Sequence, residues 1–291
     1  MKNKSILITG GTGSLGKALT RHILTNHPEI KRLVIFSRDE QKQFEMEQEF
    51  SHSKYPSIRY FIGDVRDLER LERAFSGIDY VIHAAAMKHV HIAEYNPDEC
   101  VKTNVLGAQN VIKASLKTNV KRVVALSTDK ACAPINLYGA TKLTSDKLFV
   151  SANNIKGNKD ICFSVVRYGN VMGSRGSVIP LFNQQISKGG PITVTDSKIE
   201  RYFMTIQEAA ELVIQAGSLT QKSGEIFILD MGKSIKILDL AKQMIKMNGS
   251  IPIIQGKNTL SNQSNEIGIQ FSGLRPGEKM REELTYKTKI K

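Results

Sequence analysis

A tyrosine and a lysine four residues apart, Tyr138 and Lys142, lie in a segment with a helical pattern over residues 138–152. Residues four apart share one face of a helix, so the lysine ammonium can stand beside the phenol. A neighbouring positive charge lowers the pKa of a tyrosine, which then accepts an alcohol proton during hydride transfer. Tyr-x-x-x-Lys alone is common and mostly structural, but here Ser127 and Thr128 precede it at the end of an apolar strand. Together these residues favour oxidation of an alcohol.

An acid and a base, Asp129 and Lys130, directly follow Thr128. They come at the carboxyl end of a predicted parallel strand, where the ligands of such sheets gather. An acid beside a base indicates proton transfers beyond simple oxidation. The alternative is a surface ion pair, which contributes little to stability.

A glycine-rich turn joins the first predicted strand to the first predicted helix. Glycines at its first, fourth and seventh positions permit a tight turn, close approach to a pyrophosphate and close helix packing. The free N–H groups at the start of the helix then face the phosphates. The alternative is a turn without a ligand, but the position within a βαβ unit favours a dinucleotide site. Its predicted residues are Gly10, Thr12, Gly13, Ser14, Leu15 and Gly16.

The second predicted strand ends in Ser37 and Arg38. NAD-selective sites usually place an acidic residue here, whereas a hydroxyl and a guanidinium suit the 2′-phosphate of NADP. We therefore favour NADP over NAD, the alternative being a solvated turn with Asp39 as a helix cap. Further cofactor contacts are expected after the third and fourth strands, at Asp64, Val65, Ala84, Ala85 and Ala86.

Apolar strands alternate with helical patterns through residues 1–168, which predicts a Rossmann-type, doubly wound parallel sheet with a smaller C-terminal substrate-binding domain. The predicted helices include a long one over residues 98–117. The cofactor domain is expected to span residues 1–168, with residues 205–230 returning to it. Residues 169–204 and 231–291 form the substrate domain, and the polar stretch 257–270 is expected to be a loop.

Composition excludes several classes of protein. The 291 residues are 41% hydrophobic, which is sufficient for a core and argues against disorder. The net charge of +13 comes from scattered lysines and arginines, so we expect polyanionic ligands and no nucleic acid. Apolar runs are too short for a membrane span, and no secretory signal is visible. Three widely spaced cysteines have no metal-ligand rhythm, so we expect no metal site and a cytoplasmic protein.

The motif set resembles the extended short-chain dehydrogenase/reductase superfamily. Within it, the chain resembles the bacterial UDP-N-acetylglucosamine 4,6-dehydratases of surface-polysaccharide and flagellin-sugar synthesis, from residue 4 to about residue 285. The segments that carry the resemblance are residues 127–131 (STDKA), 136–142 (NLYGATK), 167–171 (RYGNV), 173–180 (GSRGSVIP) and 275–279 (RPGEK).

The resemblance implies a redox-neutral dehydration of UDP-N-acetylglucosamine with a tightly bound cofactor that each turnover regenerates. Tyr138, assisted by Thr128 and Lys142, would take the C4 hydroxyl proton. Lys130 would remove the C5 proton, and Asp129 would protonate the departing C6 hydroxyl. It also implies a cofactor contact at Asn104 and substrate contacts at Lys88, Asn170, Arg175, Val178, Thr195, Arg201, Arg275 and Glu278.

Two subgroups of this family are mixed in the chain. Residues 136–142 match the soluble members and favour inversion at C5, whereas residues 201–247 look like the catalytic part of the membrane-anchored members. The resemblance also suggests a homo-oligomer, at least a dimer. A UDP-N-acetylhexosamine 4-epimerase is the nearest alternative, although it has no use for Asp129 and Lys130. A non-catalytic NADP sensor or scaffold is a third reading, which the intact set of reactive residues disfavours.

Overall fold

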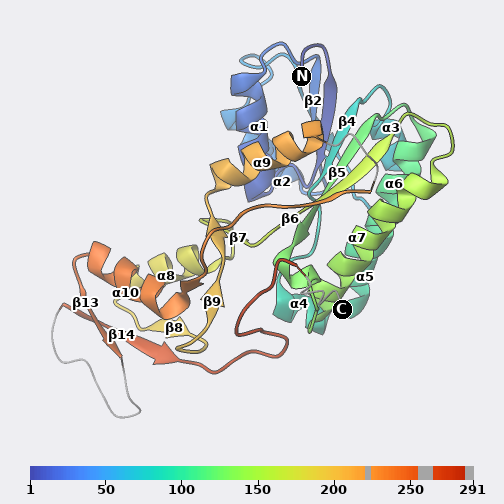
Figure 1. The fold of residues 1–291 in the computed structure, drawn as a ribbon. Helices are drawn as coiled ribbons and strands as arrows, with labels where there is room; N and C mark the ends of the chain where they lie inside the picture. Colours follow the sequence, from blue (N-terminus) through green and yellow to red (C-terminus); the bar gives the residue numbers. More distant parts are fainter. Residues whose placement is uncertain (220–223, 255–264, 286–291) are drawn as a thin grey trace.

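The computed structural model describes residues 1–219, 224–254 and 265–285. A seven-stranded parallel sheet has the strand order β11-β6-β5-β4-β1-β2-β3 (Figure 1). The strands are β1 (Ser5–Thr9), β2 (Arg32–Ser37), β3 (Ile58–Ile62), β4 (Tyr80–His83), β5 (Arg122–Thr128), β6 (Cys162–Tyr168) and β11 (Ile226–Ile228). The strand order reverses between β1 and β4, where open sheets of this kind bind ligands beyond the carboxyl ends of their strands. The predicted doubly wound α/β fold is confirmed.

Helices cover both faces of this sheet (Figure 1). Side chains of α1 (Ser14–Asn26), α2 (Glu40–Glu49) and α9 (Ile206–Leu219) contribute to one core. Side chains of α3 (Leu68–Ala74), α6 (Gly107–Lys117) and α7 (Leu137–Ile155) contribute to the other. Side-chain caps fix where several helices begin: Asp39 accepts from the Lys42 N–H, and Asn136 accepts from the Gly139 N–H.

The helix predicted over residues 98–117 is interrupted by a π-helical turn. After α4 (Val90–Tyr95), the chain forms α5 (Pro97–Val101), the π-helical turn (Lys102–Leu106) and then α6. Asn104 in this turn is buried, and its amide accepts from the Met87 N–H and donates to the Met87 carbonyl. The widened turn thus holds the loop that follows β4, as single π-turns often do near functional sites.

A smaller unit lies beside the large sheet, at the lower left of Figure 1. Its parallel sheet consists of β13 (Ile251–Ile254), β14 (Glu266–Phe271) and β8 (Ile192–Val194). Helices α8 (Val178–Ser187) and α10 (Ile237–Met247) pack on it around a separate core. Two short ladders lie between the units: β7 (Asn170–Val171) pairs with β10 (Phe203–Met204), and β9 (Glu200–Arg201) pairs with β12 (Ile235–Lys236).

The prediction that residues 257–270 form a loop is wrong for the part that is described. Glu266–Phe271 is strand β14, paired on both sides, and it buries Ile267 and Ile269 in the core of the smaller unit. Polar neighbours in the sequence hid this alternation, because only every second residue of the strand faces the core. Residues 257–264 lie outside the described residues.

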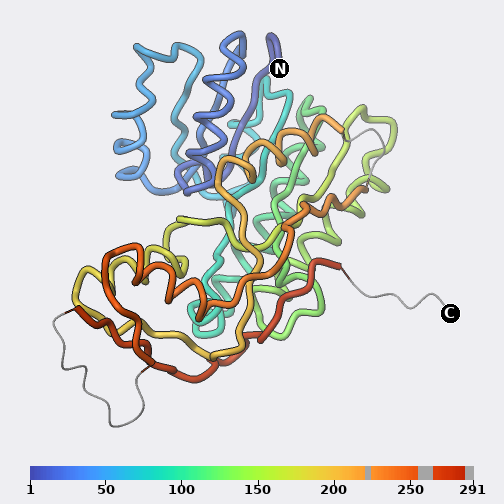
Figure 2. The backbone as a smooth tube through the Cα atoms, turned by 60° about the vertical axis from the view of Figure 1, so that its left-hand side comes forward, coloured from blue at the N-terminus to red at the C-terminus, as the bar shows by residue number. Residues whose placement is uncertain are grey.

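Residues 272–285, called here the C-terminal segment, form neither helix nor strand. They run from the smaller unit back to the large sheet (Figure 2, dark red). The Asn136 side chain donates to the Gly277 carbonyl at 2.8 Å, and Arg167 donates to the Leu284 carbonyl at 3.3 Å. The segment therefore packs against the carboxyl edge of the large sheet.

None of the helices in the described ranges combines the length and apolar composition needed to cross a bilayer. The three cysteines, Cys100, Cys132 and Cys162, are buried and free.

Candidate active site

The glycine-rich turn lies tightly against the loop that follows β4. Gly10 has a φ of +65°, and a Cβ there would come within 2.8 Å of the Ala85 backbone. A Cβ on Gly16 would lie 2.3 Å from the Gly11 carbonyl oxygen, so only glycine lets α1 start this close. Thr9 Oγ1 ties both strand ends together, since it bonds His83 Nδ1 at 2.8 Å and accepts the Ala85 N–H at 3.3 Å. This narrow cradle at a helix N-terminus fits the pyrophosphate of a dinucleotide.

The end of β2 places an exposed guanidinium where the cofactor ribose is expected. Ser37 is buried and its hydroxyl accepts from Gln43, so only Arg38, with its side chain 61% exposed, can reach outward. Asp39 caps helix α2: its carboxylate accepts from the Lys42 N–H and pairs with the Lys42 ammonium. The helix-cap reading of Asp39 is therefore correct.

Asp64, at the end of β3, lies 3.6 Å from the Arg38 guanidinium and 2.7 Å from that of Arg66. Burial opposes the charge of Asp64, but hydrogen bonds from Arg66 hold its carboxyl pKa below the usual range. Val65 is buried in the core of the sheet. The Asn104 amide hydrogen-bonds the Met87 backbone and the Thr141 hydroxyl, so Asn104 holds the loop of residues 84–89 in position.

Three consecutive residues at the end of β5 form a buried acid–base group. Asp129 is fully buried, and its Oδ1 accepts from the Thr128 hydroxyl at 2.9 Å and from Lys130 Nζ at 3.0 Å. Asp129 Oδ2 has no hydrogen-bond partner among the described residues. Burial opposes the charge of Lys130, but Asp129 and Glu282 together raise the pKa of its ammonium. The surface-pair alternative is therefore excluded by burial, and the group can hold and pass a proton.

Tyr138 and Lys142 lie on α7, which packs beside β5 and β6. Burial raises the pKa of Tyr138 above its ordinary value, although a hydrogen bond with Thr128 opposes this rise. Burial also lowers the pKa of Lys142. In the protein alone the pKa of Tyr138 is therefore raised, and Lys142 is not among the groups that shift it. The expected lowering by Lys142 together with the charge of the nicotinamide stays a prediction for the protein with bound cofactor.

A buried ion pair, Arg167–Asp146, lies next to this site. Arg167 Nη2 lies 2.9 Å from Asp146 Oδ2, and both side chains are at most 5% exposed. The Ser127 hydroxyl donates to the same oxygen at 2.8 Å. The network joins β5, β6 and α7 directly behind Thr128.

We expect Asp146→Asn to lower the free energy of unfolding by about 3 kcal/mol, because it leaves the buried Arg167 guanidinium without a counter-charge. Urea unfolding followed by circular dichroism measures this change. Asp160→Asn is the matched control, since its side chain is 77% exposed in its pair with Lys121. A loss for Asp146→Asn as small as that for the control would mean that the network does not support the fold.

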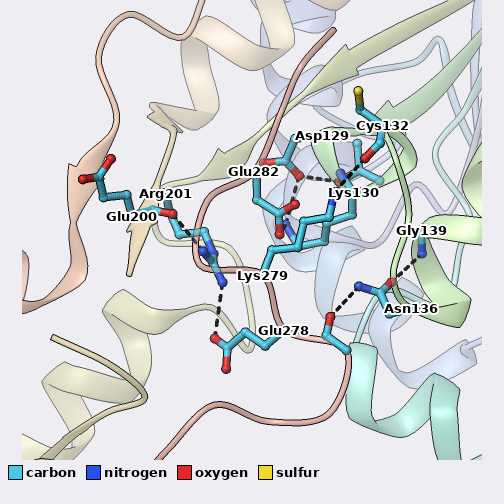
Figure 3. A network of polar contacts seen from close by, with 12 residues as sticks. Asp129, Lys130, Cys132, Asn136, Gly139, Glu200, Arg201, Glu278, Lys279 and Glu282 are labelled. Atoms are coloured by element: carbon cyan, nitrogen blue, oxygen red, sulfur yellow. Dashed lines mark hydrogen bonds and ion pairs between the residues drawn. The ribbon is translucent and has the colours of Figure 1, made fainter. Parts of the chain in front are cut away.

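The residues expected to hold the nucleotide meet where the C-terminal segment passes the smaller unit. Glu278 Oε1 accepts from Thr195 Oγ1 at 3.2 Å and from Arg201 Nη2 at 3.3 Å, as Figure 3 shows for Arg201. Glu278 Oε2 accepts from the Arg275 N–H at 3.2 Å. Arg201 is 7% exposed, so its guanidinium is fixed by these contacts. The structure thus brings Thr195, Arg201, Arg275 and Glu278 together.

A second group of predicted substrate residues lies nearer the glycine-rich turn. The Arg175 N–H donates to Ser14 Oγ at 3.1 Å, and Lys88 Nζ donates to the Arg175 carbonyl at 2.8 Å. The Arg175 side chain is 60% exposed and 3.9 Å from Glu45. Asn170 lies in β7, and Val178 begins α8. Arg175 therefore lies on the cofactor side and is not with the Thr195 group.

Glu282 was missed by the sequence reasoning. Its side chain is 2% exposed, and its Oε1 lies 3.5 Å from Lys130 Nζ (Figure 3). The only signal in the sequence is its position three residues after the RPGEK segment, among other charged residues that are exposed. In the part of the chain that is described, no three His, Cys, Asp or Glu side chains group in a way that could hold a metal ion.

Comparisons with known proteins agree with this geometry. Residues 6–291 match the family described as polysaccharide biosynthesis protein. A Campylobacter jejuni protein named UDP-N-acetylglucosamine 4,6-dehydratase (inverting) is 56% identical over 239 residues, 82% of this chain and 70% of the relative. A Rickettsia typhi protein named UDP-glucose 4-epimerase is 40% identical, over 97% of this chain and 77% of the relative.

The crystal structure of Pen from Bacillus thuringiensis superposes with a TM-score of 0.88 at 47% identity, over 98% of this chain and 83% of that one. The resemblance found in the motifs is confirmed by these matches. The chain belongs to the polysaccharide biosynthesis protein family, with relatives named UDP-N-acetylglucosamine 4,6-dehydratases.

Proposed function

We propose that this protein converts UDP-N-acetylglucosamine into a UDP-4-keto-6-deoxy-N-acetylhexosamine with inversion at C5. The steps are oxidation at C4, elimination of water across C5 and C6, and return of hydride to C6. The observation that carries the proposal is the buried Asp129–Lys130 pair beside Thr128 and Tyr138. The substrate and the inversion are supported by the name of the 56% identical relative.

Tyr138 is the group that takes the C4 hydroxyl proton. Its hydrogen bond with Thr128 holds the phenol at the end of β5, beside Asp129. Lys142 lies one helical turn further on and is 4% exposed. Its amino group lies on the same face of α7 as the Tyr138 phenol and can carry a positive charge or accept a proton there. A bound nicotinamide dinucleotide supplies the acceptor for the C4 hydride and later the donor to C6.

Asp129 and Lys130 can perform the elimination with a closed proton balance. The proton of the Lys130 ammonium passes over 3.0 Å to Asp129 Oδ1, which gives a neutral amine and a carboxylic acid. The amine removes the C5 proton, which the C4 ketone has acidified, and the acid protonates the departing C6 hydroxyl. The pair ends this step as ammonium and carboxylate, the state in which it began. No proton from bulk water is required.

The uridine diphosphate is expected to lie along the contact between the smaller unit and the C-terminal segment. Arg201 and Arg275 supply positive charge for the diphosphate, and Glu278 and Thr195 supply polar atoms for the ribose and sugar. Asn170, Arg175, Lys88 and Val178 border the sugar from the side of the glycine-rich turn. The excess of basic residues suits this polyanionic ligand.

NADP is the cofactor we propose, in preference to NAD, and it is bound tightly because each turnover regenerates it. Its 2′-phosphate would meet Arg38, which is exposed and oriented by Asp64. The glycine-rich turn would hold the pyrophosphate, and Ala84, Ala85 and Ala86 allow it to approach.

We expect Arg38→Ala to weaken NADP binding about tenfold or more and to leave NAD binding unchanged, because only the phosphate contact is lost. Titration of the protein, freed of bound nucleotide, with each dinucleotide measures both dissociation constants. Arg73→Ala is the control, since that guanidinium is 76% exposed on α3, where it pairs with Glu69. An equal loss for both dinucleotides would contradict the assignment of Arg38 to the phosphate.

The resemblance also supports a homo-oligomer, a dimer or larger, which analytical ultracentrifugation tests. The widely spaced cysteines support a cytoplasmic location. An epimerase is the second candidate, since the Rickettsia relative carries that name. Epimerisation needs only removal and return of the C4 hydride, so Asp129 and Lys130 would have no catalytic role in it.

The experiment that tests the proposal is mass spectrometry of the nucleotide sugar after incubation of purified protein with UDP-N-acetylglucosamine, with and without added NADP. Loss of one water supports the dehydratase, and NMR in deuterated water then reads the configuration at C5. An unchanged mass with a new C4 epimer would assign the protein as an epimerase. No change in either reaction would refute both assignments for this substrate.

A further inference from the structure

The C-terminal segment brings a second buried carboxylate to Lys130. Glu282 Oε1 lies 3.5 Å from Lys130 Nζ, and Figure 3 shows its carboxylate close to that of Asp129. Glu282 Oε2 is buried and has no hydrogen-bond partner among the described residues, as is also true of Asp129 Oδ2. Buried carboxylate oxygens without partners are rare in proteins, because each loses its hydration without compensation. Two such carboxylate oxygens, from Asp129 and Glu282, lie near Lys130, which indicates that these carboxylates have a role in the reaction.

The segment does not need Glu282 to stay in place. The Gly277 carbonyl accepts from Asn136 at 2.8 Å, and Lys279 Nζ donates to the Cys132 carbonyl at 2.8 Å. The Met280 carbonyl accepts from the Glu200 N–H at 3.0 Å. Together with the bond from Arg167 to the Leu284 carbonyl, these contacts hold the chain on both sides of Glu282 without using its carboxylate.

The charged and titratable groups around Lys130 come from four parts of the chain. Asp129 follows β5, Glu282 lies on the C-terminal segment, and Arg201 lies on β9. Tyr138 on α7 interacts with Asp129. The Lys130 ammonium faces two carboxylates and one guanidinium, so removal of one carboxylate leaves the local charge one unit more positive.

We propose that Glu282 is a positioning residue for Lys130: it holds Nζ close to two carboxylates and raises the pH up to which the Asp129–Lys130 pair keeps its single proton. The inference rests on the proposed dehydration, in which that proton moves between Nζ and Asp129 Oδ1. Without the negative charge of Glu282, the Lys130 ammonium releases its proton more easily, so the loss of this proton moves to lower pH.

The test compares wild type, Glu282→Gln and Glu282→Asp over a range of pH. For Glu282→Gln we expect kcat to fall about tenfold to a hundredfold with KM nearly unchanged, because Nζ is less well placed. The alkaline limb of the pH profile of kcat, at which the Lys130 ammonium loses its proton, should move down by about one unit. Glu282→Asp keeps the charge at a longer distance, so kcat falls but the limbs stay close to those of wild type.

Glu283→Gln is the matched control, since it makes the same change at the next position, where the side chain is exposed. It should leave kcat and both limbs unchanged. Thermal unfolding of each variant shows whether it is folded. If Glu282→Gln fails to fold, Glu282→Asp decides: wild-type kcat, or an alkaline limb displaced like that expected for Gln, would overturn the inference.

Failure of this inference and failure of the proposed function give different results. If wild type removes no water from UDP-N-acetylglucosamine, the proposed function is wrong. If wild type removes water and folded Glu282→Gln keeps the wild-type pH limbs, Glu282 has only a structural role.

Discussion

Replacement of Lys130 by alanine should reduce dehydration by about a thousandfold or more while oxidation at C4 continues. Lys130 Nζ lies 3.0 Å from Asp129 Oδ1, and in the proposed reaction its ammonium is the source of the proton that Asp129 gives to the C6 hydroxyl. The variant loses both the base and this proton source. In the proposed reaction, C4 oxidation depends on Tyr138 and Thr128, which the substitution leaves in place.

Two measurements separate these steps. Mass spectrometry follows the loss of water, and the absorbance of reduced nicotinamide in a single turnover follows oxidation at C4. The Lys130→Ala variant should accumulate reduced nicotinamide and release no water. Lys121→Ala is the control, because that lysine is 45% exposed in its pair with Asp160. Dehydration by Lys130→Ala at the wild-type rate would show that the base is another residue.

The variant also tests the charge balance of the site. Without Lys130, two buried carboxylates, Asp129 and Glu282, lose their shared cation. Buried anions without a partner take up protons and lower the stability of the fold. Thermal unfolding should therefore show a larger loss for Lys130→Ala than for the double variant Lys130→Ala/Glu282→Gln, in which one of the two charges is gone.

Local patterns in the sequence were sufficient to predict the sheet and the placement of several candidate site residues on it. Parallel strands share one edge for their carboxyl ends, so Gly10, Arg38 and Asp129 could be placed together from strand boundaries alone. The fourfold spacing of Tyr138 and Lys142 likewise follows from helix geometry. These residues are placed by the regular elements to which they belong.

The features that the sequence did not reveal depend on irregular chain or on distant contacts. Glu282 reaches Lys130 along a segment without helix or strand, where no periodicity marks a buried position. Arg175 joins the glycine-rich turn because its backbone bonds Ser14, a contact that no local pattern predicts. The raised pKa of Tyr138 comes from burial by the whole fold, which the pair Tyr138 and Lys142 alone could not indicate.

Replacement of Tyr138 by phenylalanine should block the reaction at its first step, with a loss of about a hundredfold to ten-thousandfold. The phenol is the group beside Thr128 that can take the C4 proton, and phenylalanine keeps the ring without the hydroxyl. Unlike Lys130→Ala, this variant should accumulate no reduced nicotinamide. Dehydration must fall by the same factor, since the C5 proton is not acidified until C4 is a ketone.

The rate of the first step, C4 oxidation, is expected to rise with pH. Burial raises the pKa of Tyr138, so the phenol is protonated at neutral pH in the protein alone. A base that must lose its proton works faster as the pH rises, so single-turnover oxidation in wild type should increase with pH. In Tyr138→Phe the residual rate should no longer follow this rise.

Tyr80→Phe is the matched control, because Tyr80 begins β4 at the amino edge of the sheet, where its ring lies 5.9 Å from the Lys4 ammonium. It should oxidise C4 at the wild-type rate with the wild-type pH dependence. Retention of the pH-dependent rise by Tyr138→Phe would assign the titrating base to another group, with the buried Lys142 as the next candidate. The two variants of the site thus divide the reaction: Tyr138→Phe stops it before reduced nicotinamide forms, and Lys130→Ala stops it after.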